Sequence, residues 1–220
     1  MRLPIIQAGE EVLRVQARKL SREEVLSETI QELIEHMKET MRYAPGVGLA
    51  APQVGISLQL AVIEDREEYQ QKLTAEQLSE RQRESIPFHV IINPRIVNPA
   101  IVNPGNVNPG IVSPGNVSSS DSADVEYFEG CLSVPGYSAI VSRARSVTVE
   151  YLNESAEPKR VHAAGWYARI LQHEIDHLAG ILYVDRMNAR TWTTVDNLER
   201  VWKGLSIAEV QTRLGLRDRE

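Results

Sequence analysis

The chain has 220 residues, of which 42% are hydrophobic and 25% charged, and this composition predicts a single folded domain. Its net charge of -6 argues against a general nucleic-acid binder, and no apolar run reaches the roughly 18 residues that a transmembrane helix needs. The N-terminal segment has no compact apolar stretch and carries Glu10 and Glu11, unlike a signal or transit peptide. The single cysteine, Cys131, excludes an intrachain disulfide, and we expect a reducing cytoplasm.

The first predicted element is a helix over 21–43. Ser21 and Glu24 form a capping box at its start. Apolar residues then recur at helical spacing, and Pro45 with Gly46 ends the helix. The stretch 46–55 is rich in small residues, which favours either a tight turn or close approach of the backbone to a ligand. It lacks the residue order of a phosphate-binding loop.

Strand-like segments alternate with polar turns through the middle of the chain. A second capping box, Thr74 with Gln77, predicts a short exposed helix over 74–83. The strand composition predicts β-structure at 58–63, 88–92, 125–128, 139–142, 146–152 and 160–164. Two weaker, peripheral helices are expected at 194–204 and 206–215.

A five-residue repeat begins at Asn93 and reads NPRIV, NPAIV, NPGNV, NPGIV and SPGNV. Proline at this spacing removes too many amide donors for a helix or a central strand, and Pro-Gly pairs favour successive turns. We therefore predict an inserted, turn-rich loop at about 98–122.

Residues 173–177 read H-E-x-x-H within a helix that begins at Gly165 and is closed by Gly180. Positions four apart lie on one face of a helix, so His173 and His177 can reach one cation, and Glu174 can reach a water bound to it. The alternative is a chance occurrence of this pattern on a solvated helix.

A catalytic metal site of this kind needs a third protein ligand. The candidates are His36, His89, His162, a carboxylate and Cys131. A lone cysteine is also common as a small buried hydrophobic residue, so the residue types leave the third ligand open.

Three stretches occur in a characteristic order: G-V-G-L-A-A-P-Q at 46–53, E-G-C-L-S at 129–133 and Q-H-E-I-D-H-L-A-G at 172–180. Together they resemble the three signature motifs of the peptide deformylases. The resemblance extends from Leu3 to Arg190 and leans toward the type 1 subgroup that includes organellar enzymes. It implies a catalytic domain over 1–190, carrying the repeat insertion, and a C-terminal helical extension over 191–220. It also implies an α+β fold of small, mostly antiparallel sheets packed around a central helix that carries HExxH.

The resemblance implies a role for each matching residue. Metal ligands would be Cys131, His173 and His177, with Fe(II) as the usual ion and Zn(II), Ni(II) or Co(II) as substitutes. Catalytic roles fall to Glu174 as acid and base, and to Gln53 and the Leu132 amide as oxyanion donors. Substrate-binding positions would be Val47, Gly48 and Gly130. Four extra copies of the pentapeptide depart from the family pattern and put substrate access near the site in doubt.

The implied activity is hydrolysis of the formyl group from N-formylmethionyl peptides, which releases formate. The implied partners are that peptide and, transiently, the ribosome, with no nucleic-acid motif, no membrane, and a monomeric or homodimeric state. One rival is an H-E-x-x-H peptidase, which would need a further histidine or glutamate ligand downstream, and no histidine follows His177. Another is a metal-stabilised binding module, which would not require Glu174 or Gln53.

The residues around the candidate site also predict how its ligands are held. Glu129 and Arg143 are expected to form a buried or half-buried ion pair. Asp176 orients a neighbouring group, caps a strand or is a simple surface carboxylate. His89 and His162 are expected to be structural histidines.

Overall fold

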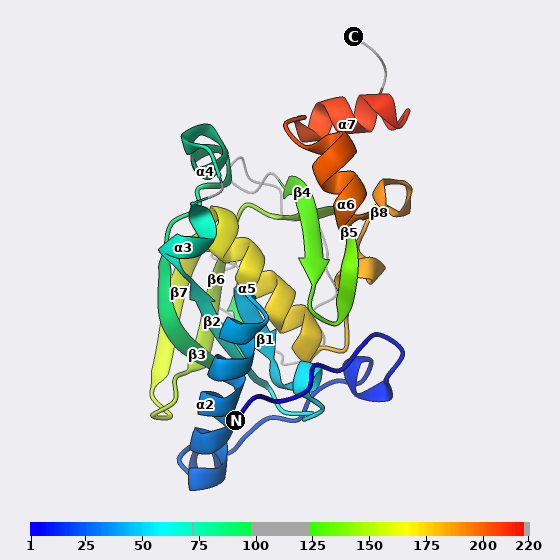
Figure 1. The fold of residues 1–220 in the computed structure, drawn as a ribbon. Coiled ribbons are helices and arrows are strands. Elements are labelled where there is room, and N and C mark those ends of the chain that lie inside the picture. The colour runs from blue at the N-terminus through cyan, green and yellow to red at the C-terminus, as the bar shows by residue number, and fades with distance from the viewer. Residues whose placement is uncertain (72, 98–123, 218–220) are drawn as a thin grey trace, which may run out of the picture.

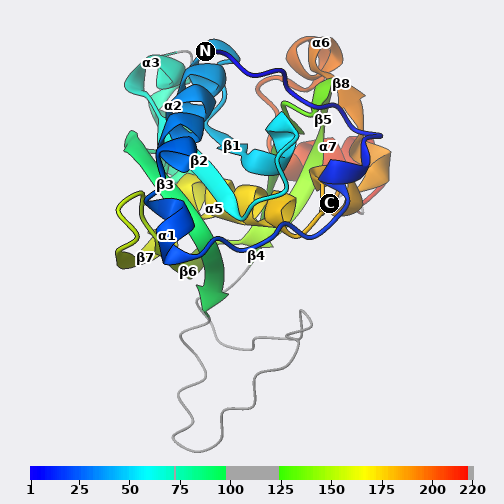
Figure 2. The same cartoon turned by 90° about the horizontal axis from the view of Figure 1, so that it is seen from below.

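The computed structural model describes residues 1–71, 73–97 and 124–217. At its centre lies helix α5 (Gly165–Leu178), which carries the HExxH residues. Figure 1 shows α5 between a five-stranded sheet and the β4–β5 pair, and Figure 2 shows the same arrangement from below. Every strand pair in the two sheets is antiparallel, so the expected α+β fold with a central helix is confirmed.

The five-stranded sheet has the order β1-β2-β3-β6-β7, and the three-stranded sheet has the order β4-β5-β8. The strands are β1 (Gly48–Ala50), β2 (Leu60–Asp65), β3 (Ile86–Val97), β4 (Asp124–Cys131), β5 (Val134–Ala144), β6 (Ser146–Leu152), β7 (Pro158–Ala164) and β8 (Thr193–Thr194). The remaining helices are α1 (Arg22–Val25), α2 (Glu28–Tyr43), α3 (Glu67–Gln70), α4 (Ala75–Arg81), α6 (Val195–Asn197) and α7 (Ile207–Arg213), with a π-helical turn at Leu198–Trp202 and four short 3-10 turns.

Helices cover both faces of the five-stranded sheet, as its interior strand β2 shows. Successive side chains of a strand point to opposite faces. Leu60 and Val62 therefore pack with the apolar stripe of α2, while Ala61 and Ile63 pack with α5. All six residues of β2 are buried, and their sequence is a continuous apolar run followed by two carboxylates. This packing fixes α5 against the sheet.

The predicted helix over 21–43 is interrupted. The capping box of Ser21 and Glu24 is present, but it starts the four-residue helix α1. The Ser27 side chain then accepts a hydrogen bond from the Ile30 amide and caps a second helix, α2. Ser27 therefore caps a new helix and divides the segment that the apolar spacing alone predicts as one helix.

The predicted strand over 88–92 is longer at both ends and passes through Pro94 to Val97. Asn93 has a φ of +50°, and the register between β3 and β6 shifts between Ile92 and Arg95. The irregular strand accommodates a proline that cannot donate to the ladder. The Asn93 side chain also donates to the Leu20 carbonyl and accepts from the Leu20 amide, which anchors the bulge.

The predicted insertion at 98–122 lies outside the described residues. The helix at 74–83 is confirmed as α4, with its Thr74–Gln77 capping box. In the C-terminal region, the first expected helix is only α6 followed by the π-helical turn, and the second is α7. None of the helices in the described part of the chain has the length and apolar character needed to cross a membrane.

Candidate metal centre

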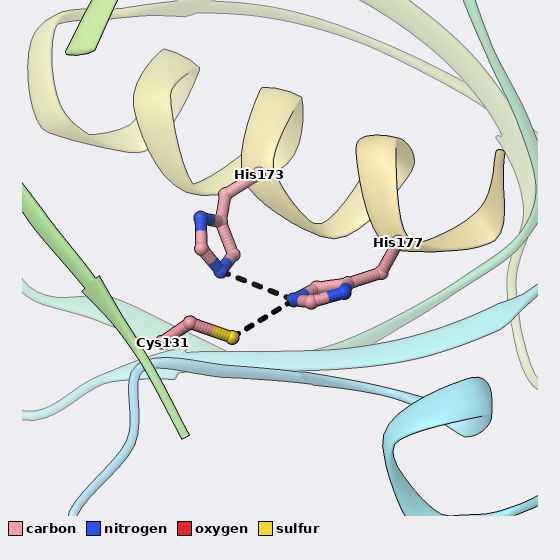
Figure 3. Close-up of side chains that lie close together, drawn as sticks. All are labelled: Cys131, His173 and His177. Carbon is pink, nitrogen blue, oxygen red and sulfur yellow. Dashed lines mark hydrogen bonds between the residues drawn. The ribbon is translucent and has the colours of Figure 1, made fainter. Parts of the chain in front are cut away.

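Three side chains from two distant segments converge beside α5 (Figure 3). The Nε2 atom of His177 lies 3.2 Å from Cys131 Sγ and 3.2 Å from His173 Nε2. Their ligand atoms all lie within 4.8 Å of one another, and no other such group of three is found among the residues described. The structure thus brings together the two histidines and, among the candidates for a third ligand, Cys131.

Local backbone geometry presents these side chains. His173 and His177 are four residues apart on α5, so their rings project from the same face. Cys131 ends β4, where the β4–β5 register shifts between Glu129 and Cys131 before Cys131 pairs with Val134. This irregularity at the hairpin end turns the thiol toward the helix.

Glu129 fixes the orientation of the first histidine. Its Oε1 accepts a 2.6 Å hydrogen bond from His173 Nδ1, so the Nε2 lone pair faces the cluster. Burial by itself lowers the pKa of His173, but the Glu129 carboxylate and the Cys131 sulfur raise it well above its usual range. The pKa of His177 lies well below its usual range because the ring is buried and faces His173. The pKa shifts of both histidines therefore arise from burial together with the charged groups around the cluster.

The donor set fits a divalent transition metal. A tetrahedral ion with bonds of about 2.0–2.3 Å separates its ligand atoms by roughly 3.5 Å. The two separations from His177 Nε2, to Cys131 Sγ and to His173 Nε2, are both 3.2 Å and close to that value. One thiolate and two imidazoles also suit zinc or iron better than magnesium or calcium, which prefer oxygen ligands.

Glu174 provides a carboxylate at the edge of the cluster. The residue is 3% exposed, and its Oε2 atom has no hydrogen-bond partner among the residues described. Burial raises the pKa of this carboxyl to about 7. A Cβ added at Gly48 would overlap the Glu174 carboxylate, so only glycine leaves room for it there. Gly48 therefore sets how closely β1 approaches this group.

Gln53 is held with its amide nitrogen toward the cluster. Its Oε1 accepts from the Ala50 amide at 2.9 Å, which fixes the orientation of the side chain. Its Nε2 donates to Cys131 Sγ at 3.4 Å and to the buried Ser133 hydroxyl at 3.3 Å. Gln53 therefore presents a preorganised N–H donor within 3.4 Å of the Cys131 sulfur.

A cleft of about 450 Å³ is lined by two of the three potential ligands, Cys131 and His173, and by Glu174. Val47 and Gly48 line one side, and Gly130 and Leu132 line another, so the structure brings all four predicted positions to this cleft. Its wall also includes the apolar side chains of Phe128, Trp166 and Ile170. The cleft is therefore an apolar recess with polar groups gathered at the metal cluster.

A buried ionic network supports the site from behind. The predicted Glu129–Arg143 ion pair is confirmed, with contacts of 2.6 and 2.9 Å. Arg143 also donates to Asp176 at 2.8 Å, which makes Asp176 a buried orienting group and not a surface carboxylate. Hydrogen bonds from Arg143 and His173 outweigh the effect of burial and hold the pKa of Glu129 far below its usual range.

Two members of this network were missed from the sequence. Arg169 donates to Glu129 at 2.8 Å, and Arg186 forms a bidentate pair with Asp176. Arg169 lies four residues before His173 on the same helix, and that spacing is a usable signal. Arg186 follows the helix, and its pairing depends on a turn that no local pattern reveals.

The other histidines lie away from the cluster. His89 contacts the Pro87 carbonyl and the Tyr167 hydroxyl, and His162 contacts the Thr148 hydroxyl. The contacts of His89 fit the expectation of a structural histidine, whereas His162 is exposed on β7. His36 is half-buried on α2.

A buried or half-buried Cys/His/His set with an adjacent carboxylate and an apolar cleft is typical of a metal-dependent hydrolase. The family model "Polypeptide deformylase" matches residues 2–192, and the chain belongs to this family. Members of the family are metal-dependent hydrolases that remove N-terminal formyl groups from nascent peptides.

Individual relatives agree with that assignment. The chain is 42% identical over 195 residues to peptide deformylase 1A, chloroplastic, of Solanum lycopersicum, covering 89% of this chain and 63% of that protein. It is 39% identical over 211 residues to peptide deformylase 1A, chloroplastic/mitochondrial, of Arabidopsis thaliana, covering 96% and 69%. These plant relatives support the subgroup that includes organellar enzymes.

A solved structure has the same fold. The Met-Ala-Ser-bound class I type b peptide deformylase of Acinetobacter baumannii superposes with a TM-score of 0.67 at 32% identity, covering 85% of this chain and 99% of that one.

Proposed function

We propose that this chain hydrolyses the N-terminal formyl group of formylmethionyl peptides at the Cys131–His173–His177 cluster. The observation that carries the proposal is the convergence of these three ligand atoms beside a cleft that Cys131, His173 and the buried Glu174 line. Family membership supports the same reaction.

The proposed ligands are Cys131 Sγ, His173 Nε2 and His177 Nε2, and the proposed ion is Fe(II), with Zn(II), Ni(II) or Co(II) able to substitute. When bound there, a divalent cation would act as a Lewis acid that makes water nucleophilic near neutral pH. The thiolate cancels one positive charge, so the site is softer than one built from neutral histidines. Glu129 keeps His173 in the tautomer that presents Nε2.

Glu174 is proposed to move the proton. With its pKa raised to about 7 by burial, the carboxylate is suited to accept a proton from the attacking water near neutral pH. It then returns the proton to the amine nitrogen as the bond to the formyl carbon breaks. The products are formate and a peptide with a free N-terminal methionine.

Gln53 and the Leu132 amide are proposed to stabilise the oxyanion that forms on the formyl oxygen. One preorganised donor of this kind contributes about 3–4 kcal/mol. The hydrogen bond from the Ala50 amide to Gln53 Oε1 supports this role, because it keeps Nε2 directed toward the cluster.

Val47, Gly48 and Gly130 are proposed to bind the peptide backbone. Strand β1 lies at the edge of the five-stranded sheet, so a peptide can add to it as a further strand. The methionine side chain would enter the recess near Ile170 and His173, which both line the cleft.

The decisive experiment measures formate release from formyl-Met-Ala-Ser by protein prepared anaerobically with Fe(II). We expect the wild type to be active, Glu174→Ala to keep its metal but lose turnover, and Cys131→Ser to lose metal affinity. Glu35→Ala, which removes an exposed glutamate, is the matched control and is expected to match the wild type. Full activity in Glu174→Ala would overturn the mechanism.

The identity of the metal has its own test. Oxidation of the thiolate ligand and of Fe(II) makes the iron form sensitive to oxygen. Activity of the iron-loaded protein is expected to decay in air, while that of the nickel- or zinc-loaded protein persists. Equal decay of all three forms would contradict Fe(II) as the sensitive component.

We further propose a cytoplasmic location, transient association with the ribosome and a monomeric or homodimeric state. The reduced thiol that metal binding needs supports the location, and the origin of the substrate at the ribosome supports the association. The proposed domain organisation is a catalytic domain over 1–190 with the insertion at 98–122, and a C-terminal extension over 191–220. Cosedimentation with ribosomes and analytical ultracentrifugation test the partner and the oligomeric state.

A further inference from the structure

The β4–β5 hairpin carries Glu129 and Cys131, and apolar packing contributes little to its position. Within the described residues, it pairs with no strand of the five-stranded sheet. Its apolar cluster has three buried members, Ala139, Val141 and Tyr183, whereas the two main clusters are several times larger. Because stabilisation by apolar packing grows with the area buried, the hairpin depends on other contacts for its position.

The segment 187–213 covers the outer edge of β5, and we call it the C-terminal strap. Its strand β8 pairs with the edge of β5, with Ser138 opposite Thr193. Two residues further along the same edge, the Asn188 amide donates to the Ile140 carbonyl at 2.9 Å. Figure 1 shows β8 and α6 beside β5. The strap therefore supplies the hairpin with backbone partners along its outer edge.

One buried threonine of the C-terminal strap holds the middle of this edge. Thr191 is 2% exposed, and its Oγ1 accepts a 2.8 Å hydrogen bond from the Ile140 amide. The same hydroxyl donates to the Asn188 carbonyl at 2.7 Å, so it serves as both acceptor and donor. Ile140 lies opposite Phe128, one residue before Glu129. Thr191 therefore holds the hairpin next to the carboxylate that orients the first histidine.

A second contact ties the other strand of the hairpin to α7. Gln211 is 6% exposed, and its Nε2 donates a 2.7 Å hydrogen bond to the Glu126 carboxylate on β4. A hydrogen bond to an ionised acceptor is about twice as strong as one between neutral groups. The neighbouring Val210 is 1% exposed, so α7 is packed onto the protein at this point. The C-terminal strap thus holds both strands of the hairpin.

The position of the hairpin decides how well the proposed ligand atoms meet. One of them comes from β4 and the other two come from α5. If the hairpin is correctly placed in only a fraction of the molecules, the apparent affinity for the metal falls by that fraction. Contacts that fix the hairpin before the ion arrives therefore tighten metal binding without touching a ligand.

We propose that Thr191 and Gln211 are positioning residues of the metal centre. Acting through the β4–β5 hairpin, they hold Cys131 where it can share an ion with the two histidines. The inference rests on the proposed function, because it concerns the same metal centre. Gln211 lies beyond the residues 2–192 that the family model matches, so the C-terminal strap brings an outlying part of this chain into the support of the site.

The test measures two properties of the full-length protein that need no substrate. The first is the affinity for Co(II), followed by the charge-transfer absorption of the cobalt–thiolate bond. The second is the rate at which iodoacetamide alkylates Cys131 in the metal-free protein. Because Cys131 is the only cysteine of the chain, the label reports on this position alone. Thr191→Val and Gln211→Leu are each expected to weaken Co(II) binding by about tenfold and to speed alkylation.

Matched controls separate positioning from a general loss of stability. Thr191→Ser keeps the hydroxyl and is expected to retain the wild-type Co(II) affinity. Thr40 on α2 is 3% exposed, and its hydroxyl accepts from the Leu3 amide at 2.8 Å and donates to the His36 carbonyl at 2.7 Å. Thr40→Val therefore removes a hydroxyl with the same bonding pattern and should also lower the free energy of unfolding. It is expected to leave Co(II) affinity and alkylation unchanged.

The contact between Gln211 and Glu126 has an exchange test of its own. Gln211→Glu places two carboxylates together and is expected to weaken Co(II) binding at least as much as Gln211→Leu. Adding Glu126→Gln restores an amide donor and a carboxylate acceptor, and most of the lost affinity should return. Because Glu126 is half-buried, these variants keep the inference testable if Thr191→Val does not fold.

Two results would overturn the inference. Wild-type Co(II) affinity and alkylation in Thr191→Val or in Gln211→Leu would show that the residue concerned does not position the thiol. An equal change in Thr40→Val would make the effect a general consequence of lower stability. Neither readout involves substrate, so both results leave the deformylase proposal standing. Absence of formate release by the wild-type Fe(II) protein would refute the proposed function and leave the metal measurements unaffected.

Discussion

Replacing Gly48 by alanine tests whether this position sets the location of the Glu174 carboxylate. A Cβ at Gly48 would lie 2.6 Å from Glu174 Cδ and 2.8 Å from its Cγ. Carbon atoms pack at about 3.5–4.0 Å, so the carboxylate must move by about 1 Å. A displacement of that size at a reacting group costs about 10²-fold in rate. The φ of Gly48 lies outside the left-handed region, so the backbone itself accepts alanine.

The assay combines turnover with a thermodynamic cycle. Gly48→Ala is expected to lower kcat for formate release by about 10²-fold at unchanged metal content, because no ligand is touched. Overpacking should also lower the free energy of unfolding by about 1–3 kcal/mol in the wild-type background. In Glu174→Ala the overlapping atoms are gone, so most of that cost should vanish. Turnover within about threefold of the wild type, or an equal cost in both backgrounds, would refute the reasoning.

Three further perturbations address the surroundings of the site. Arg143→Met removes the buried partner that Glu129 and Asp176 share, and we expect it to lower the free energy of unfolding in urea by about 3–5 kcal/mol. Arg186→Met changes a 41%-exposed side chain and should lower that free energy by about 1 kcal/mol or less. Equal losses in the two variants would contradict the network. Burial lowers the pKa of His89 in the folded protein, so the unfolded chain binds the proton more tightly and the free energy of unfolding should fall as pH drops below 6.5. His89→Gln should make this pH dependence weaker, and an unchanged dependence would contradict the lowered pKa. Deletion of 98–117 is expected to leave formate release near the wild-type rate, and a large loss of turnover would assign those residues a part in the reaction.

Local signals in the sequence were sufficient for much of the fold. Ser21 and Thr74 form the capping boxes expected of them, and Gly180 adopts the positive φ of a residue that follows a helix. The prediction that His173 and His177 lie on one face likewise required only that this segment be helical. These features depend on contacts within four or five residues, which is why a single sequence reveals them.

Features that depend on contacts between distant segments were harder to predict. The residue types left five candidates for the third ligand, and only the resemblance to a family singled out Cys131. The strand bulge at Asn93 depends on hydrogen bonds to Leu20, more than seventy positions away. The spacing of Arg169 from His173 is a local signal, but its partner Glu129 lies on the distant strand β4. The pairing of Arg186 with Asp176 depends on the turn after the helix, which no local pattern reveals.

The hairpin position of Cys131 has a consequence for the mechanics of the protein. The thiol belongs to β4, whereas both imidazoles belong to α5, so a bound ion cross-links the smaller sheet to the central helix. Such a cross-link closes a long loop of chain and removes freedom from opened states, much as a disulfide does. Amide hydrogen exchange in the β4–β5 hairpin should therefore slow when metal is added and quicken on chelation, making the hairpin a reporter of metal occupancy without any substrate.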